Sequence, residues 1–259
     1  MFQLEKWYGD VTTPGGRGVI CYAGRLQWGP ARVRYAATLV ADAHAPREQA
    51  TTRGVELPQV ADDVATWRHA GLGIAGRWCR GAPAIAQCLA DGPEGAIDWT
   101  CHIPRARAQV RVGDTTLDGW GYVESVRLTI PPWRLPFGTL RWGRYLSDRH
   151  WLVWIDWSGG TAGRRCWTWL DGAPQPEAVV HAVGVQGLRG GSRLEFGATR
   201  VLRDRPLLDT LRTPLPALAR RLAPTLSQAH ECKRLGAAAL VTAAGASDQG
   251  CVLYEDVSW

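Results

Sequence analysis

The sequence predicts an all-β protein made of antiparallel strands. Short runs of β-branched, aromatic and other apolar residues recur at roughly 8–12-residue spacing, which is typical of antiparallel sandwiches and barrels. Turn-forming pairs separate these runs, for example Asp91-Gly92 and Asp171-Gly172. Helical periodicity is confined to Leu207–Leu222, where leucines recur at steps of three to four residues. We therefore expect an antiparallel β protein with one short helix in its C-terminal half.

The N-terminal half predicts a series of hairpins. Val19–Gln27 and Ala31–Val40 are separated by the turn-forming pair Gly29-Pro30, which indicates a β-hairpin. Five shorter strands follow, each bounded by turn-forming residues. They are expected at Val64–His69, Gly73–Arg80, Ala84–Ala90, Gly95–Cys101 and Ala106–Gly113.

The distribution of tryptophan divides the chain into two halves. Eight of the 14 tryptophans lie between Trp120 and Trp169. Just before them, Asp114–Gly119 (DTTLDG) is polar and turn-prone. The chain has 259 residues, and single hydrophobic cores usually stop growing at about 250 residues. We therefore expect two domains, residues 1–118 and 119–259, each large enough for one small barrel.

Composition excludes several classes of protein. Hydrophobic residues make up 46% of the chain and charged residues 21%, which excludes an intrinsically disordered protein. No apolar run reaches the ~18 residues of a membrane helix, so stable membrane insertion is not expected. The net charge of +6 comes without a basic cluster or a nucleic-acid-binding motif, so nucleic acid is not an expected partner. Composition does not indicate the oligomeric state.

The expected location is the cytoplasm. The N-terminal stretch MFQLEKWYGD lacks the pattern of a signal peptide, and the seven cysteines form no CxxC pair. Motifs for phosphate loops, zinc proteases, serine hydrolases and EF-hands are absent, and the six histidines lie far apart in the sequence. We expect no metal and no cofactor.

Three further strands are predicted in the tryptophan-rich region, and each carries one charged residue on a face that also contains tryptophan. Neighbouring side chains of a strand point to opposite faces, so residues two apart share a face. The strands are Gly119–Ile130 (Glu124 with Trp120 and Tyr122), Leu140–Leu146 (Arg144 with Trp142) and Trp151–Trp157 (Asp156 with Trp154).

The three charged residues have two interpretations. Glu124, Arg144 and Asp156 can form a buried ion-pair network, because buried charges are rare unless they are paired. Alternatively, they belong to a tryptophan-walled cavity in which desolvation raises the pKa of a carboxyl group and makes it a proton donor. Spacing alone leaves both interpretations open.

Four motifs in this region resemble bacterial proteins related to carotenoid 1,2-hydratase (hydroxyneurosporene synthase). The wider superfamily includes tocopherol cyclase and the lipocalin-like Diels–Alderases. The motifs are GWGYVE at 119–124, LTIPPW at 128–133, LRWGR at 140–144 and VWIDW at 153–157, with weaker matches at WTC (99–101), ECK (231–233) and YE (254–255).

The resemblance implies two lipocalin-like antiparallel β-barrel domains with a ligand cavity between or inside them. It also implies cofactor-free chemistry on hydrophobic polyenes or isoprenoids, by proton transfer or by a pericyclic step. In the hydratase branch the catalytic acid is an aspartate two residues after an aromatic residue, and Trp154-x-Asp156 is similar to that pattern.

We therefore expect a cofactor-independent enzyme that cyclises, isomerises or hydrates a hydrophobic polyene, terpenoid or polyketide. Asp156 or Glu124 is the expected general acid or base, and Arg144 is the expected charge partner. Three alternatives stay open: a Diels–Alderase-type pericyclase that works by cavity shape, a non-catalytic carrier of an apolar small molecule, and an oligomeric structural protein. The expected substrate-binding wall consists of Trp120, Tyr122, Trp142 and Trp154.

Overall fold

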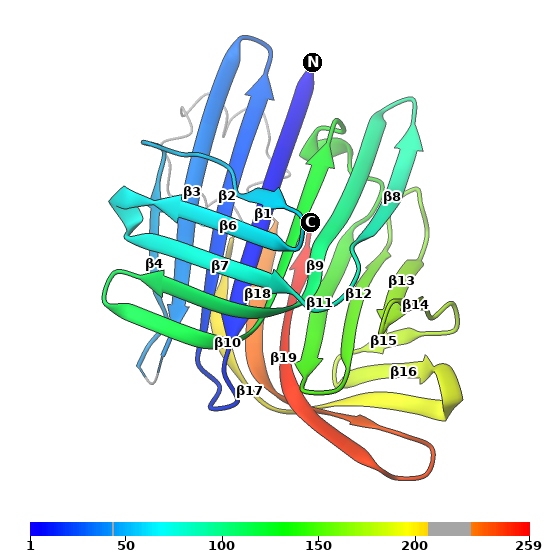
Figure 1. The fold of residues 1–259 in the computed structure, drawn as a ribbon. Coiled ribbons are helices and arrows are strands. Elements are labelled where there is room, and N and C mark those ends of the chain that lie inside the picture. The colour runs from blue at the N-terminus through cyan, green and yellow to red at the C-terminus, as the bar shows by residue number, and fades with distance from the viewer. Residues whose placement is uncertain (43, 207–228) are drawn as a thin grey trace. The chain divides into compact units, whose positions relative to one another are not determined.

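The computed structural model describes residues 1–42, 44–206 and 229–259 (Figure 1). Within these residues the regular structure is antiparallel β-strand, apart from three single 3₁₀ turns. The predicted fold class is confirmed. The helix expected at Leu207–Leu222 lies outside the described residues.

The described chain forms two compact units. The first comprises residues 1–13 and 17–135, and the second comprises residues 14–16 and the described residues from 136 onwards. The boundary predicted after residue 118 falls instead inside strand β10 (Thr115–Leu128). The first residue of Asp114–Gly119 lies in a tight turn between β9 and β10, and β10 begins directly after it, with Thr115 paired to Val112 of β9. The units separate after a proline-containing segment, where Pro131 and Pro132 lack the N–H that a strand ladder requires.

A ten-stranded antiparallel sheet makes up the first unit, with order β4-β3-β2-β1-β10-β9-β7-β6-β5 and β8 paired to β9. The predicted hairpin is β2 and β3, and the first three short predicted strands appear as β6, β7 and β8 with at most small shifts of their ends. Besides β10, the strands are β1 (Phe2–Thr12), β2 (Gly18–Trp28), β3 (Ala31–Ala41), β4 (Arg47–Thr51), β5 (Gln59–Ala61), β6 (Val64–His69), β7 (Ile74–Arg80), β8 (Ile85–Gly92) and β9 (Gly95–Val112).

One long strand, β9, replaces the two strands expected at Gly95–Cys101 and Ala106–Gly113. Its first part pairs with β8 and its second part with β7. Pro104 lies between the two parts, and the pairing with β10 shifts register at the same place. The missing N–H of proline thus produces an irregularity within one strand rather than a break between two.

Trp78 occupies a slot lined by glycines in the core of the first unit. A Cβ atom added to Gly76 would lie 2.4 Å from the indole ring, and one added to Gly121 would lie 2.7 Å from it. The indole Nε1 donates a hydrogen bond to the backbone carbonyl of Asp10 at 2.6 Å. The glycines therefore allow a large ring to lie directly against the backbone of neighbouring strands.

A second antiparallel sheet, of nine strands, makes up the second unit, with order β14-β13-β12-β11-β19-β18-β17-β16-β15. The C-terminal strand β19 lies in the middle of this sheet, between β11 and β18 (Figure 1). The strands are β11 (Thr139–Ser147), β12 (Trp151–Ser158), β13 (Arg165–Leu170), β14 (Ala173–Pro174), β15 (Val179–His181), β16 (Gly184–Leu188), β17 (Ser192–Pro206), β18 (His230–Val241) and β19 (Ser247–Ser258).

Trp154 repeats the tryptophan–glycine contact in the second unit. It pairs with Gly143 across β11 and β12, and a Cβ atom on Gly143 would lie 2.2 Å from its ring. The indole stacks on Phe196 with ring centroids 5.7 Å apart, and Phe196 stacks on Tyr254 at 4.8 Å. These three rings form an aromatic layer, and apolar residues such as Leu152 pack with it in one core cluster.

Replacement of Gly143 by alanine is expected to destabilise the second unit. The added methyl group overlaps the ring of Trp154, and overpacking of this kind costs about 1–3 kcal/mol of unfolding free energy. Gly138→Ala is the control, because a Cβ there would meet only the carbonyl oxygen of Ser158 at 3.9 Å. Chemical denaturation of both variants measures the difference, and equal stabilities would contradict the proposed packing constraint.

Candidate functional site

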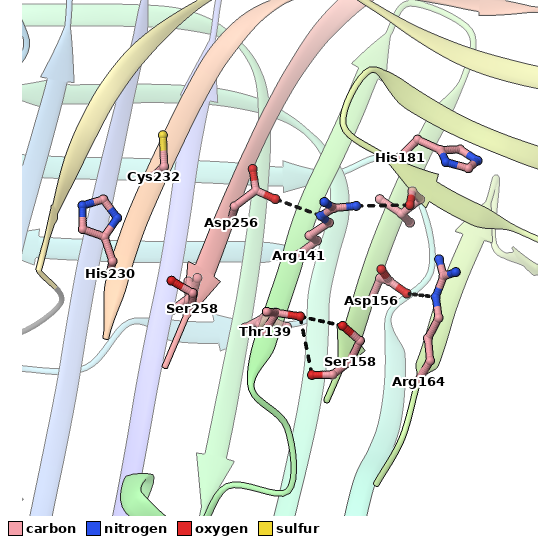
Figure 2. Close-up of a pocket in the computed structure, with 13 residues that line it drawn as sticks. Thr139, Arg141, Asp156, Ser158, Arg164, His181, His230, Cys232, Asp256 and Ser258 are labelled. Atoms are coloured by element: carbon pink, nitrogen blue, oxygen red, sulfur yellow. Dashed lines mark hydrogen bonds and ion pairs between the residues drawn. The ribbon is translucent and has the colours of Figure 1, made fainter. Parts of the chain in front are cut away.

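The second unit contains a pocket of about 610 Å³, within the roughly 300–1,000 Å³ range of small-molecule sites. It lies where β11 and β18 begin and where β12 and β19 end (Figure 2). Its lining is mainly polar, in contrast to the tryptophan-walled cavity that the sequence predicts. The charged or titratable lining residues are Arg141, Asp156, Arg164, His181, His230, Cys232 and Asp256.

Strand register brings the charged residues together. Arg141 on β11 pairs with Asp156 on β12 and with Asp256 on β19, so these three side chains project from one face of the sheet. Two residues further along β11, Gly143 pairs with Trp154 and Tyr254. The aromatic layer therefore separates the charged pocket from the apolar core.

Asp156 is a buried carboxylate in the pocket wall. Its side chain is only 7% exposed, and Oδ1 accepts a hydrogen bond of 3.2 Å from Nε of Arg164, whose side chain is 51% exposed. Asp156 pairs in register with Cys166 on β13. Burial is the main cause that raises the pKa of the Cys166 thiol above its usual value. A carboxylate in a pocket wall can exchange a proton with a ligand bound in the pocket.

A second ion pair lies next to Asp156. Nε of Arg141 donates to Oδ1 of Asp256 at 3.1 Å, and its Nη1 donates to the carbonyl oxygen of Val180 at 3.4 Å. Arg234 also contacts Asp256, at 3.4 Å. The pocket thus holds two carboxylates, each paired with arginine.

Arg144 does not pair with Asp156, and that expectation is wrong. Arg144 pairs with Val153 in the strand register, which places its side chain on the opposite face of β11 and β12 from Asp156. It is fully buried, and its Nη1 donates to the carbonyl oxygen of Cys251 at 3.4 Å. Trp142 shares this opposite face. Of the four predicted wall residues, Trp154 alone shares the face of the Asp156 pocket.

A buried ionic network lies on the same face as Arg144. Arg203 Nη1 contacts both oxygens of Glu231, at 2.9 and 3.2 Å, and Lys233 Nζ lies 3.4 Å from Glu231. Lys233 also donates to Glu255 and lies over the ring of Trp142, 5.5 Å from its centroid. This network was not predicted from the sequence, although ECK at 231–233 is one of the weaker family matches. Its signal is the Glu231-x-Lys233 spacing, which puts opposite charges on one strand face.

The remaining predicted residues lie in the first unit, because β10 belongs to the first sheet. Glu124 Oε2 accepts hydrogen bonds from the hydroxyl of Tyr122 at 2.6 Å and from Nε1 of Trp99 at 2.5 Å. Burial raises the pKa of Tyr122 well above its usual value. The guanidinium groups of Arg105 and Arg107 lie 4.2 and 3.6 Å from the ring centroid of Trp120.

Glu124, Arg144 and Asp156 therefore do not share one sheet. The strand of Glu124 belongs to one sheet, and the strands of the other two residues belong to the second. Glu124 and Tyr122 are brought together as predicted, by alternation along a single strand.

The structure offers no recognisable metal or dinucleotide site among the residues that it describes. Within the described residues, no group of three or more His, Cys, Asp or Glu side chains is placed to hold a metal ion. Gly71–Gly76 (GLGIAG) matches the GxGxxG string, but it joins β6 to β7 without the helix that a dinucleotide site requires. In the described parts of the chain, no helix has the length and apolar character needed to cross a bilayer.

The two ionic sites are expected to respond differently to neutral substitutions. Glu231→Gln removes the negative charge that faces the buried Arg203 and Lys233, and breaking a buried pair costs about 3–5 kcal/mol of unfolding free energy. Asp156→Asn leaves a solvated Arg164, and loss of a pair of that kind costs about 1 kcal/mol or less. Thermal and chemical denaturation of both variants provide the comparison. If Asp156→Asn lost more unfolding free energy than Glu231→Gln, the assignment of Glu231 to a structural network and of Asp156 to a functional pocket would be contradicted.

Comparison with known proteins finds similarity in structure only. No family model and no curated protein matches the sequence. CghA, which has also been solved with Sch210972, matches at 11% identity and a TM-score of 0.59, over 99% of this chain and 88% of CghA. A protein of Nitrosomonas europaea assigned as AttH matches at 11% identity and a TM-score of 0.55, over 99% of this chain and 92% of that one.

Kievitone hydratase from Nectria haematococca also matches, at 10% identity and a TM-score of 0.52, over 98% of this chain and 88% of the hydratase. At these identities the likeness is one of fold. The chain therefore has the two-domain lipocalin-like fold of these proteins, as its motifs predict.

Proposed function

We propose that the chain is an enzyme that cyclises, isomerises or hydrates an unsaturated small molecule by proton transfer at Asp156. The fold supports this kind of function, because one protein that shares it is a hydratase and another has been solved with a small molecule bound. Polyenes, terpenoids and unsaturated polyketides are the substrate classes. The chemistry requires a proton acceptor and a shaped pocket, and both are found in the second unit.

The observation that carries the proposal is a buried carboxylate in the wall of a pocket of ligand size. Asp156 is nearly inaccessible to bulk water but lines a space of about 610 Å³. The carboxylate removes a proton from one carbon of the substrate and exchanges it with solvent, and the resulting acid delivers a solvent-derived proton to another carbon. In a hydration, the protonated carboxyl group donates its proton to a double bond, water adds to the resulting cation, and the surplus proton of that water returns to the carboxylate. Acid–base catalysis of this type contributes typically ~10²–10⁴-fold.

Asp156→Asn is expected to abolish the exchange of protons between substrate and solvent. The intact chain is incubated in D2O with a panel of polyenes, terpenoid alkenes and unsaturated polyketides, and products are analysed by mass spectrometry. Proton-transfer chemistry places deuterium on carbon, and hydration also adds the mass of one water. In the variant, the rate of deuterium incorporation falls by about 10²–10⁴-fold, because asparagine cannot carry the proton.

Asp256→Asn is the matched control, since it removes a second aspartate from the same pocket. Its side chain is 41% exposed, and it lies between two arginines. We expect it to retain most of the deuterium incorporation. Product without deuterium in either chain would favour a pericyclic reaction, and ligand binding without any product would favour a carrier. Full incorporation by Asp156→Asn would contradict the proposed role.

A further inference from the structure

We infer that the pocket takes a substrate with an acidic oxygen group, a carboxylate or an enolate, which binds between Arg141 and Arg164. The inference rests on the proposed function and narrows its substrate class. It favours unsaturated acids and β-dicarbonyl compounds over hydrocarbon polyenes.

Arg164 has hydrogen-bond donors that no described residue uses. Its Nε contacts Asp156, while among the described residues its Nη1 and Nη2 have no hydrogen-bond partner. The side chain is half-exposed and lines the pocket, so these nitrogens are accessible to a ligand. Guanidinium groups bind carboxylates through two parallel N–H donors, and the outer edge of Arg164 presents such a pair.

Arg141 lies on the other side of Asp156, as Figure 2 shows. Its Nε contacts Asp256 and its Nη1 makes a long hydrogen bond to Val180, while among the described residues its Nη2 has no partner. Asp256 is shared with Arg234, so Arg141 does not have to neutralise that carboxylate alone. Arg141 and Arg164 can therefore both contribute to binding an anion.

The arrangement also places the acidic group next to the proton acceptor. With a carbonyl oxygen held by Arg141 and Arg164, a β-dicarbonyl substrate presents the acidic carbon between its two carbonyl groups to Asp156. The C–H proton passes to the carboxylate, and the electron pair of that bond becomes the double bond of an enolate whose negative oxygen contacts the arginines. Positive groups aimed at a developing oxyanion are a major source of catalysis. Protonation at another carbon by Asp156 completes an isomerisation. In a ring closure, the enolate carbon first attacks an electrophilic double bond of the same molecule, and Asp156 then protonates the carbanion that this attack creates. Neither route needs an oxidant or a reductant.

Retinoic acid and retinol are suitable probes, because they share a carbon skeleton and differ in the acidic group. Binding to the intact chain is measured by calorimetry and does not depend on turnover. Charged hydrogen bonds contribute about 1.5–3 kcal/mol, so we expect the acid to bind about 10-fold or more tightly than the alcohol. Arg164→Gln and Arg141→Gln each weaken binding of the acid about 10-fold and leave the alcohol unchanged. Asp156→Asn strengthens binding of the acid, since it removes a negative charge.

Arg25→Gln is the matched control. Arg25 is also 51% exposed and also pairs with a largely buried carboxylate, Glu5, but it lies in the first unit. It should bind both probes as the parent does. Equal affinity for acid and alcohol, or no effect of the two pocket arginines, would overturn the inference. Such a failure is distinct from failure of the proposed function, which is measured by deuterium incorporation and its loss in Asp156→Asn.

Discussion

The contact between Trp154 and Gly143 determines how the second unit is built. A glycine on β11 lets the indole ring on β12 lie directly over the backbone, and Phe196 and Tyr254 extend the layer across the sheet. Apolar residues pack with these rings in one core cluster, while two residues beyond Trp154 the strand enters a charged pocket. The first unit uses the same device, with Trp78 held among glycines. Each unit thus accommodates a large aromatic ring because the neighbouring strands carry glycine at the positions that face it.

Strand alternation assigns different roles to the two faces of the second sheet. One face carries the Arg203, Glu231 and Lys233 network, in which every side chain is almost completely buried and each charge depends on the others. The other face carries Asp156, whose partner Arg164 is half-exposed and retains unused donors. Burial of all partners is typical of a structural network, whereas a buried carboxylate beside an accessible cation is suited to act on a ligand.

The sequence predicts local features well and contacts between distant strands poorly. Alternation within one strand correctly places Trp154 with Asp156 and Tyr122 with Glu124, and the hairpin of β2 and β3 follows from its turn residues. The ion pairs of the pocket could not be predicted, because Arg164, the partner of Asp156, lies in the segment before β13, and Asp256 lies 115 residues from its partner Arg141 in the chain. The domain boundary was misplaced because a tight hairpin turn has the same composition as a short linker.

The most direct measurement is a crystal structure of the chain with an unsaturated acid bound. If the account is correct, the ligand occupies the pocket of the second unit. Its carboxylate contacts Arg141 and Arg164, and an adjacent carbon lies within about 3.5 Å of an oxygen of Asp156, as a near-attack geometry requires. A ligand bound elsewhere, with the pocket filled only by water and Asp156 facing no part of the ligand, would contradict the account.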